Sequence, residues 1–368
     1  MKLERVELRR MHVPIKVPFR TSYGTAAEHQ VLWVHVVTDC GEGWAECAAE
    51  PRPEYSSEYL DGAAQVISEF LVPQLAGRDI DAHRFAADVS HLKGHRMAKA
   101  AVETALLDAQ LRGEGVSLAE HLGAVRDRVP AGVSVGIMDS VDELLRHVQG
   151  YLDDGYRRIK LKIEPGWDVE PVRAVRAAIG PDVPLQVDAN TAYTRDDGTH
   201  LARLDEFNLL LIEQPLPEDD IVGHALLAQQ VETPICLDES IVSAQVARDA
   251  IALGATSVIN IKPARVGGYL EAVAVHDACL ALDVPVWCGG MFETGIGRAA
   301  NLALAALPNF LLPGDTSASA RYFAQDTTEP FVLEDGYVRV PTGPGIGVTP
   351  IPEVVERFTV WQRAVEFA

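Results

Sequence analysis

The chain has 368 residues, of which 48% are hydrophobic and 23% are charged, and its formal net charge is −21. This length and composition are typical of a soluble enzyme built as two domains, or as one large barrel with an appendage. The charge argues against nucleic acid and an anionic membrane as partners, because both need a basic surface. The sequence contains no apolar run that approaches a membrane span, and residues 1–5 lack the long apolar segment of a signal peptide.

The five cysteines are scattered along the chain, odd in number and without a C-x-x-C pair. Such a pattern argues against a structural zinc site and against a disulfide framework. It predicts buried free thiols and a reducing, cytoplasmic location. The residues are Cys40, Cys47, Cys236, Cys279 and Cys288.

Residues 1 to about 50 read as strands, because 6–11 and 31–37 alternate in polarity or are rich in β-branched residues. Residues 41–44 predict a turn before a third strand. Two loops are expected, at 18–24 and 47–55, and both mix aromatic and polar side chains. Such loops can close over a ligand, although either loop taken alone is better explained as a simple connector.

Residues from about 57 to 125 read as helices. Ala98, Ala101, Val102 and Ala105 recur at helical spacing, and Gly113 is expected to end that helix. Together with the preceding strands, these helices predict an α+β domain over residues 1–128.

From residue 129 the pattern changes to short apolar runs that alternate with helical segments. Eight such strands favour a (β/α)₈-type barrel over an open sheet, and no G-x-G-x-x-G follows the first of them, so a dinucleotide-binding fold has little support. The barrel is expected to span residues 129–319, and residues 320–368 are expected to return to the first domain. The predicted strands are 133–137, 159–163, 185–188, 209–213, 235–238, 257–262, 285–288 and 311–314.

Asp188, Glu213 and Asp238 each end an apolar run, and they are spaced by 213 − 188 = 25 and 238 − 213 = 25 residues. One strand and one helix need a repeat of about this size, so the three acids are expected at the carboxyl-terminal rim of neighbouring strands. A single acid there would be read as a helix cap or a surface residue. Three at equal spacing repel each other unless a cation neutralises them, and oxygen ligands favour Mg²⁺ or Mn²⁺ over zinc.

Residues 159–163 alternate between aliphatic residues and lysine. On a barrel strand the aliphatic side chains pack outward on the helices, so Lys160 and Lys162 are expected to face inward, where anions must balance them. Lys162 lies nearer the rim and is the better candidate base. Lys262 ends the sixth strand and would approach from the opposite side, and Arg265 could tune it or bind an anion.

Two lysines around a carboxylate-bound metal indicate one class of reaction. The metal stabilises the enediolate that forms when a substrate carboxylate loses its α-proton, and one lysine removes that proton. The second lysine can return a proton to the opposite face, which racemises the substrate, or it can stabilise the intermediate as a cation.

The motifs around these residues resemble those of the enolase superfamily, in its muconate-lactonising-enzyme-like branch with a K-x-K base motif, over nearly the whole chain. The sequence looks most like the N-succinylamino acid racemase (N-acylamino acid racemase)/o-succinylbenzoate synthase subfamily. This resemblance implies an α/β fold, a (β/α)7β-type TIM barrel with an α+β capping domain. The motifs are RIKLKIEPGW (158–167), VDAN (187–190), IEQP (212–215), CLDES (236–240), NIKP (260–263), WCGGM (287–291) and LPGDT (312–316).

The resemblance also implies residue roles. Asp188, Glu213 and Asp238 correspond to metal ligands, and Lys162 and Lys262 to the two acid/base lysines. The residues that it places beside the metal or in support of the bases are Asn190, Glu239 and Arg265. Its expected substrate-binding residues are Lys160, Asn190, Phe19, Ser22, Tyr23, Tyr55, Gly290, Met291, Glu293 and Asp315. The second loop has Ala48 and Ala49 where bulkier apolar side chains are expected, which leaves the preferred acyl or side-chain size open.

The predicted function is therefore racemisation of N-acyl (N-succinyl) amino acids with a divalent metal, Mg²⁺ or Mn²⁺, accompanied by o-succinylbenzoate synthase activity. One alternative is o-succinylbenzoate synthesis for menaquinone as the main role. Others are dipeptide epimerisation or cycloisomerisation, which sister families perform on the same scaffold, and a non-catalytic binding protein on a retained barrel. The expected partner is a small-molecule carboxylate, and the resemblance suggests a homo-oligomer.

Overall fold

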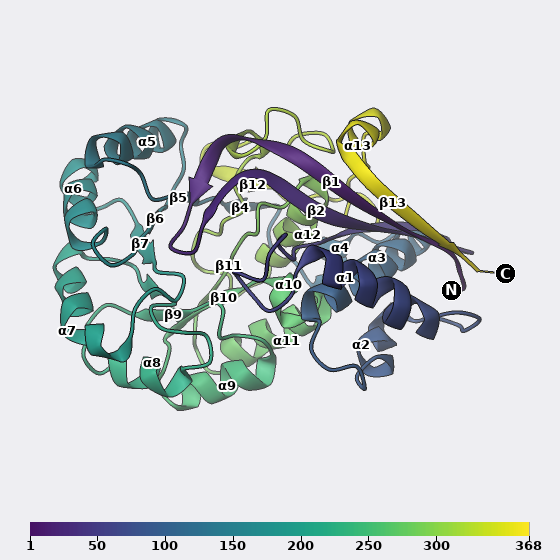
Figure 1. The fold of residues 1–368 in the computed structure, drawn as a ribbon, viewed down its shortest axis with the longest axis horizontal. Coiled ribbons are helices and arrows are strands. Elements are labelled where there is room, and N and C mark those ends of the chain that lie inside the picture. Colours follow the sequence, from purple (N-terminus) through teal and green to yellow (C-terminus); the bar gives the residue numbers. More distant parts are fainter. Residues whose placement is uncertain (368) are drawn as a thin grey trace.

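The computed structural model describes residues 1–367. An antiparallel sheet with several helices lies beside a curled parallel sheet that is surrounded by helices, and the two chain ends lie close together at the edge of the antiparallel sheet (Figure 1). No helix among the described residues has both the length and the apolar character needed to cross a membrane.

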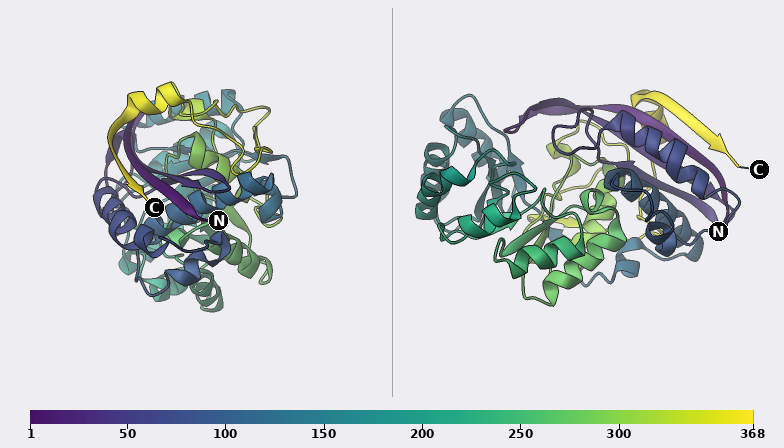
Figure 2. Two further views of the ribbon diagram at one scale, coloured as in Figure 1. Left: turned by 90° about the vertical axis from the view of Figure 1, so that its right-hand side faces the viewer. Right: turned by 60° about the horizontal axis from the view of Figure 1, so that its bottom comes forward.

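The antiparallel sheet has the strand order β13-β1-β2-β3. Its strands are β1 (Leu3–Arg20), β2 (Thr25–Thr38), β3 (Gly41–Cys47) and β13 (Thr359–Glu366). Strand β13 pairs antiparallel with β1, so the last segment of the chain joins the first domain. The long β1–β2 hairpin reaches from this sheet toward the barrel, as the turned views show (Figure 2).

Two predicted boundaries in this sheet were wrong. Residues 18–20 belong to β1, because Phe19 and Arg20 pair with Ala26 and Thr25, so the loop is reduced to a turn in which the Thr21 amide donates to the Gly24 carbonyl at 2.9 Å. Residues 41–44 belong to β3, and the turn before this strand falls at residues 39–40.

The helical part of the first domain is dominated by α3 (Arg96–Glu114), which packs on β3. The helix continues through Gly113 and ends before Gly115, which has a φ of 73°. Gly113 is needed for a different reason, since a Cβ there would lie 2.8 Å from the carbonyl oxygen of Cys40. The other elements are α1 (Leu60–Val66), η1 (Ile67–Leu71), η2 (Val72–Gln74), η3 (Ala82–Arg84), α2 (Phe85–Asp88) and α4 (Leu118–Leu122).

The parallel sheet has the order β11-β10-β9-β8-β7-β6-β5 within the described chain. Its side chains are buried on both faces, as expected for strands covered by helices outside and by packed residues inside. The strands are β5 (Val133–Val135), β6 (Ile159–Lys162), β7 (Leu185–Asp188), β8 (Ile212–Glu213), β9 (Ile235–Leu237), β10 (Val258–Ile261) and β11 (Val286–Cys288).

Helices alternate with these strands, as predicted, and a short helix, α10, also follows β10 directly. They are α5 (Val141–Asp153), α6 (Val169–Ile179), η4 (Arg195–Asp197), α7 (Gly198–Leu201), η5 (Ala202–Phe207), α8 (Ile221–Leu227), α9 (Ala244–Ala252), α10 (Pro263–Val266), α11 (Tyr269–Leu280), α12 (Gly295–Ala305) and η6 (Ser319–Arg321).

The predicted eighth strand, 311–314, is not a regular strand. Instead Phe310 bridges to Val286 of β11, and Gly314 bridges to Ala131 just before β5, both in parallel orientation. Pro313 has no amide hydrogen, so it cannot donate to a continuous ladder. These two bridges still connect the outer strands of the parallel sheet, so the sheet closes into the expected barrel, with an irregular eighth segment.

The last part of the chain contains β12 (Tyr337–Arg339), which pairs with β4 (Arg128–Pro130), and α13 (Pro352–Phe358), which leads into β13. The division of the chain at residues 128 and 319 stays a prediction, and the pairing of β13 with β1 favours it. All five cysteines are free thiols, and four are buried, but Cys40 is exposed, which corrects the expectation that all are buried.

Candidate active site

The inward lysines of β6 lie among carboxylates at the rim of the barrel. Lys160 Nζ lies 2.7 Å from Asp315 Oδ2, 3.1 Å from Glu213 Oε2 and 3.3 Å from Asp188 Oδ2. Lys162 Nζ donates to Asp188 Oδ2 and to Asn190 Oδ1, both at 2.6 Å. Both lysines are buried, so the alternation along β6 places two cations inside the barrel, where acids balance them.

The three regularly spaced acids follow one another around the sheet. Asp188 and Glu213 are register partners of β7 and β8, and Asp238 directly follows β9. Their side chains are 1%, 0% and 0% exposed. Burial alone raises the pKa of Asp188, but the ammonium groups of Lys162 and Lys160 outweigh burial and hold this pKa well below its usual range. Burial and the charge of Asp188 raise the pKa of Glu213.

Lys262 stands at the opposite side of the barrel, because three strands separate β6 from β10 in either direction once the irregular segment is counted. Its Nζ lies 2.8 Å from Asp238 Oδ2 and 3.0 Å from the Tyr55 hydroxyl oxygen. Arg265 contacts the other oxygen of Asp238 and is anchored by donating to the carbonyls of Ile241 and Asn260, each at 2.7 Å. The site therefore has one lysine on each side of a group of acids.

The donor set fits a hard divalent cation, because it consists of carboxylate oxygens from adjacent strand ends. Within residues 1–367, Lys262 and Arg265 contact the two carboxylate oxygens of Asp238 as ion pairs, and Glu239 Oε2 has no hydrogen-bond donor. As the described side chains are arranged, however, no group of three acid, cysteine or histidine residues is placed to hold an ion. The lysine ammonium groups act as the counter-ions, so metal binding requires them to move aside.

A further set of polar residues holds the acids in place. Asn190, whose φ is 42°, uses its amide nitrogen Nδ2 to donate to Glu239 Oε1 at 2.9 Å. Asn260 Nδ2 donates to Glu213 Oε1 at 2.7 Å, and Gln214 Oε1 accepts from the Asp238 amide at 2.9 Å. Sequence reasoning missed Asn260 and Gln214. The period of two along β10 could have found Asn260, because it shares the inner face with Lys262.

A small pocket leads to the lysines, and it contains nearly all of the predicted substrate-binding residues. Ser22 is the exception. Its hydroxyl donates to the carbonyls of Ala189 and Asn190, at 3.1 and 3.3 Å, so it ties the hairpin turn to the barrel rim and does not face the pocket. The pocket residues that were predicted individually are Phe19, Tyr23, Tyr55, Lys160, Asn190, Gly290, Met291, Glu293 and Asp315. Thr21, Glu50 and Phe292 also line it and lie in the segments expected to shape the substrate site, 19–23, the loop after Cys47 and 289–293, whereas Ser134 and Tyr322 were missed.

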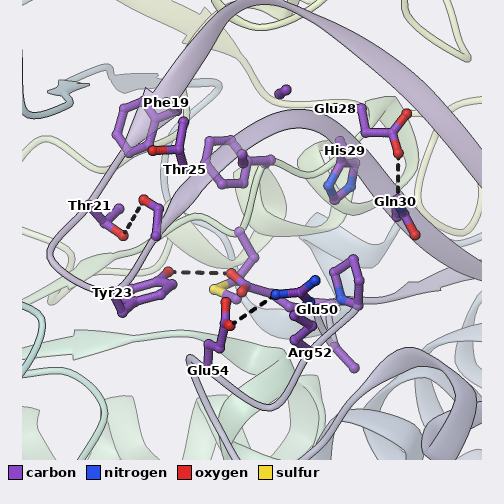
Figure 3. Close-up of a pocket in the computed structure, with 18 residues that line it drawn as sticks. Phe19, Thr21, Tyr23, Thr25, Glu28, His29, Gln30, Glu50, Arg52 and Glu54 are labelled. Carbon is purple, nitrogen blue, oxygen red and sulfur yellow. Dashed lines mark hydrogen bonds and ion pairs between the residues drawn. The ribbon is translucent and has the colours of Figure 1, made fainter.

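A larger cavity of about 360 Å³ adjoins this pocket and shares Phe19, Tyr23 and Glu50 with it (Figure 3). The Tyr23 hydroxyl donates to Glu50 Oε1 at 3.3 Å, at the boundary between the two spaces. Burial raises the pKa of Glu50. Ala48 and Ala49 form part of the cavity wall, so the small residues of the second loop leave room for a substrate side chain or acyl group.

Comparisons with known proteins agree on the family of the chain. Residues 5–123 match the N-terminal domain model of mandelate racemase / muconate lactonizing enzyme, and residues 143–354 match the model described as enolase C-terminal domain-like. The chain is 62% identical to the N-succinylamino acid racemase of Amycolatopsis sp, over 98% of this chain and 99% of that one. It is 43% identical to the o-succinylbenzoate synthase of Bacillus subtilis, over 97% of each.

Solved structures give the same result. A member of the enolase superfamily from Listeria innocua superimposes with a TM-score of 0.95 at 41% identity, over 100% of this chain and 99% of that one. The muconate lactonizing enzyme of Pseudomonas fluorescens superimposes with a TM-score of 0.92 at 26% identity, over 97% of this chain and 99% of that one.

Proposed function

This chain belongs to the enolase superfamily, in the subfamily of N-succinylamino acid racemases and o-succinylbenzoate synthases, and from that premise we propose that it racemises N-succinylamino acids. The single observation that carries the proposal is the placement of Lys162 and Lys262 on opposite sides of one buried group of acids. A reaction that inverts one carbon needs a base on one face and an acid on the other.

The two lysines have complementary roles in proton transfer. One of them, as the neutral amine, takes the α-proton, and the electron pair of the broken C–H bond moves into the substrate carboxylate to give an enediolate. The other, as the ammonium ion, delivers a proton to the opposite face of the same carbon. The product is the other enantiomer, and the lysines have exchanged protonation states, which solvent then restores. The reverse reaction uses the same groups in exchanged roles.

Enzymes of this superfamily typically use a divalent metal, and we propose Mg²⁺, with Mn²⁺ as the alternative, held by Asp188, Glu213 and Asp238. When bound, the ion supplies positive charge beside the substrate carboxylate, where negative charge accumulates as the α-proton leaves. Lys160 would add a second positive charge there, and its burial between Asp315 and the acids of β7 and β8 supports this role.

A second activity, o-succinylbenzoate synthesis, has its own support. Relatives that are 42–47% identical over 97–99% of the chain are named o-succinylbenzoate synthases. This dehydration also begins with loss of a proton next to a carboxylate, but one base on one face is sufficient for it. A single site can therefore perform both reactions. A role in menaquinone synthesis, a cytoplasmic location and a homo-oligomeric state stay predictions from the resemblance.

Proton NMR in D₂O tests the racemase proposal directly, with N-succinyl-L-phenylalanine and Mg²⁺. We expect loss of the α-proton signal together with formation of the D-isomer, and EDTA should stop both. Lys162→Ala and Lys262→Ala should each abolish racemisation, while Lys93→Ala, a substitution of an exposed lysine, should leave it unchanged. Racemisation at the wild-type rate by Lys262→Ala would contradict the two-base mechanism.

A further inference from the structure

The two lysines of the site are held by different parts of the molecule. Within the described residues, Lys162 donates its hydrogen bonds to Asp188 and Asn190, which both belong to the barrel. Lys262 donates to the hydroxyl of Tyr55, at 3.0 Å, and Tyr55 lies in the loop between β3 and α1 of the first domain. Of these two lysines, only Lys262 hydrogen-bonds a side chain from outside the barrel within the described residues.

Tyr55 is fixed where it meets Lys262. Its side chain is buried, and its hydroxyl oxygen also lies 3.4 Å from the guanidinium of Arg265. Because both cations donate to this oxygen, its own proton is free to point into the pocket that Tyr55 lines. Lys262 Nζ lies 4.6 Å from the centre of the tyrosine ring, so the ring restricts the space into which the ammonium group can swing.

This contact has a chemical consequence for Lys262. Asp238 attracts its ammonium group from one side at 2.8 Å, and a lysine held only by that ion pair would be drawn toward the acids and away from the substrate. The Tyr55 hydroxyl supplies a second acceptor, on the pocket side. A flexible lysine side chain needs such a second contact to present its nitrogen in one direction, because each free rotamer costs entropy when it is fixed.

We propose that Tyr55 is a positioning residue for Lys262 alone, so that the first domain controls proton transfer at one face of the substrate and not at the other. The inference rests on the two-lysine mechanism proposed above and adds an asymmetry to it. Docking of the 48–59 loop would then complete the hydrogen bonding of Lys262, while Lys162 has both of its hydrogen-bond partners in the barrel.

Tyr23 provides a matched comparison. It lines the same pocket, and its ring centre lies 6.3 Å from that of Tyr55. Its hydroxyl, however, donates to Glu50 at 3.3 Å, and within residues 1–367 it makes no hydrogen bond to either lysine. A phenol that only shapes the substrate pocket should affect both faces of the substrate alike, and Tyr23 is expected to behave in that way.

The experiment measures exchange at each face separately. N-succinyl-L-phenylalanine and its D-enantiomer are incubated one at a time in D₂O with Mg²⁺, and the initial rate of α-proton loss is followed by NMR. Lys262→Ala identifies the enantiomer that faces Lys262, because that enantiomer stops exchanging. The other enantiomer can still lose its proton to Lys162 and regain deuterium on the same face.

Tyr55→Phe should slow exchange of the Lys262-facing enantiomer by about tenfold to a hundredfold, which is the effect of losing one hydrogen bond to a charged group. The loss should appear in kcat more than in KM, while exchange of the other enantiomer should change by less than about threefold. Tyr23→Phe should change the exchange rates of both enantiomers by the same factor. Tyr55→Leu should show the same asymmetry as Tyr55→Phe.

Three outcomes are distinguishable. Asymmetric slowing by Tyr55→Phe supports the positioning role. Equal slowing of both enantiomers, or no slowing, overturns it and makes Tyr55 a substrate contact or a bystander. If the wild-type protein exchanges neither enantiomer, the proposed racemase function fails first, and the positioning role that rests on it fails as well. Tyr55→Phe removes a single oxygen, so it keeps the test valid if Tyr55→Leu does not fold.

Discussion

The guanidinium of Arg158 lies 2.9 Å from Asp315 Oδ1, and the two side chains are 0% and 8% exposed. The same guanidinium donates to the carbonyl of Pro313, at 2.8 and 3.2 Å. Arg158 directly precedes β6, whereas the residues that it holds belong to the irregular eighth segment. Elsewhere in the barrel, backbone hydrogen bonds join neighbouring strands. At the irregular segment 311–314 this ladder is missing, and the side chain of Arg158 supplies part of the contact.

We expect Arg158→Ala to lower the free energy of unfolding by about 3–5 kcal/mol, because it leaves Asp315 buried without one of its two cations. Urea unfolding measures this change. The neighbouring Arg157 is the matched control, since its guanidinium donates only to the carbonyl of Asp335 among the described residues and is exposed. Arg157→Ala should cost less than about 1 kcal/mol, and an equal loss for the two variants would contradict the bridging role of Arg158.

Metal binding can be detected without measuring catalysis. Mg²⁺ at about a hundred times its dissociation constant should raise the free energy of unfolding by about 2.7 kcal/mol, because the folded protein binds the ion and the unfolded chain does not. Asp238→Asn should remove this increment, and Asp182→Asn, a change at an exposed acid, should retain it. For each variant, the free energy of unfolding is compared with and without Mg²⁺. A difference in stability between the metal-free variants therefore does not affect the result. An undiminished increment in Asp238→Asn would exclude Asp238 as a ligand.

The sequence predicted the inner face of the barrel well, because period-two alternation in a sheet that is buried on both faces leaves Lys160 and Lys162 only one direction to point. The acids Asp188 and Glu213 were found for a similar reason, since each ends a strand of a regular repeat. These are local patterns, and they depend little on distant parts of the chain.

What the sequence did not predict depends on contacts between distant segments. The hydroxyl of Ser22 donates hydrogen bonds to carbonyls that lie 167 and 168 residues away in the sequence. The direction of the Ser22 side chain is therefore set by how the hairpin turn packs on the barrel. Residues 311–314 have the composition of a strand, but Pro313 interrupts the ladder and Arg158 takes over part of its role. The ion pairs between the lysines and the acids likewise depend on which charged side chains the fold brings together from different strands.

His29 makes the stability of the protein depend on pH. Its side chain is buried near the rings of Phe292 and Phe323, and burial, aided by the charge of Arg298, lowers its pKa from 6.5 to about 3. The folded protein therefore keeps His29 neutral between pH 6.5 and about 3, where the unfolded chain binds a proton. Stability from this residue is complete above pH 6.5 and is lost as the pH falls toward 3.

From the two pKa values, 6.5 and about 3, His29 lowers the free energy of unfolding by about 2 kcal/mol when the pH falls from 7.5 to 5. His29→Leu should remove this part of the acid sensitivity, so the difference in unfolding free energy between the variant and the wild type should shift by that amount over this range. His91→Leu changes an exposed histidine and should leave the pH dependence as it is. Parallel pH profiles for wild type and His29→Leu would mean that His29 does not stay neutral in the folded state.

Gly289 directly follows β11 and lies against the side chains of two residues of the site. A Cβ at this position would be 2.6 Å from Asn260 Nδ2 and 2.7 Å from Lys262 Cε, which is closer than such atoms approach. The methyl group of Gly289→Ala must therefore displace Asn260, which holds Glu213, or Lys262 itself. A displacement of the order of 1 Å in a catalytic group lowers kcat by about a hundredfold.

Steady-state racemisation and urea unfolding of Gly289→Ala test this expectation together. We expect a loss in kcat of about tenfold to a hundredfold with a destabilisation of about 1–3 kcal/mol, the usual cost of overpacking. Gly150→Ala is the control, because Gly150 is exposed in α5 and a Cβ there meets no described atom within 4 Å. That control should keep its activity, and its free energy of unfolding should rise by about 0.5–1 kcal/mol, because alanine has a higher helix propensity than glycine. Wild-type kcat in Gly289→Ala would show that Lys262 tolerates the displacement, and the close packing around this lysine would then have no role in orienting it.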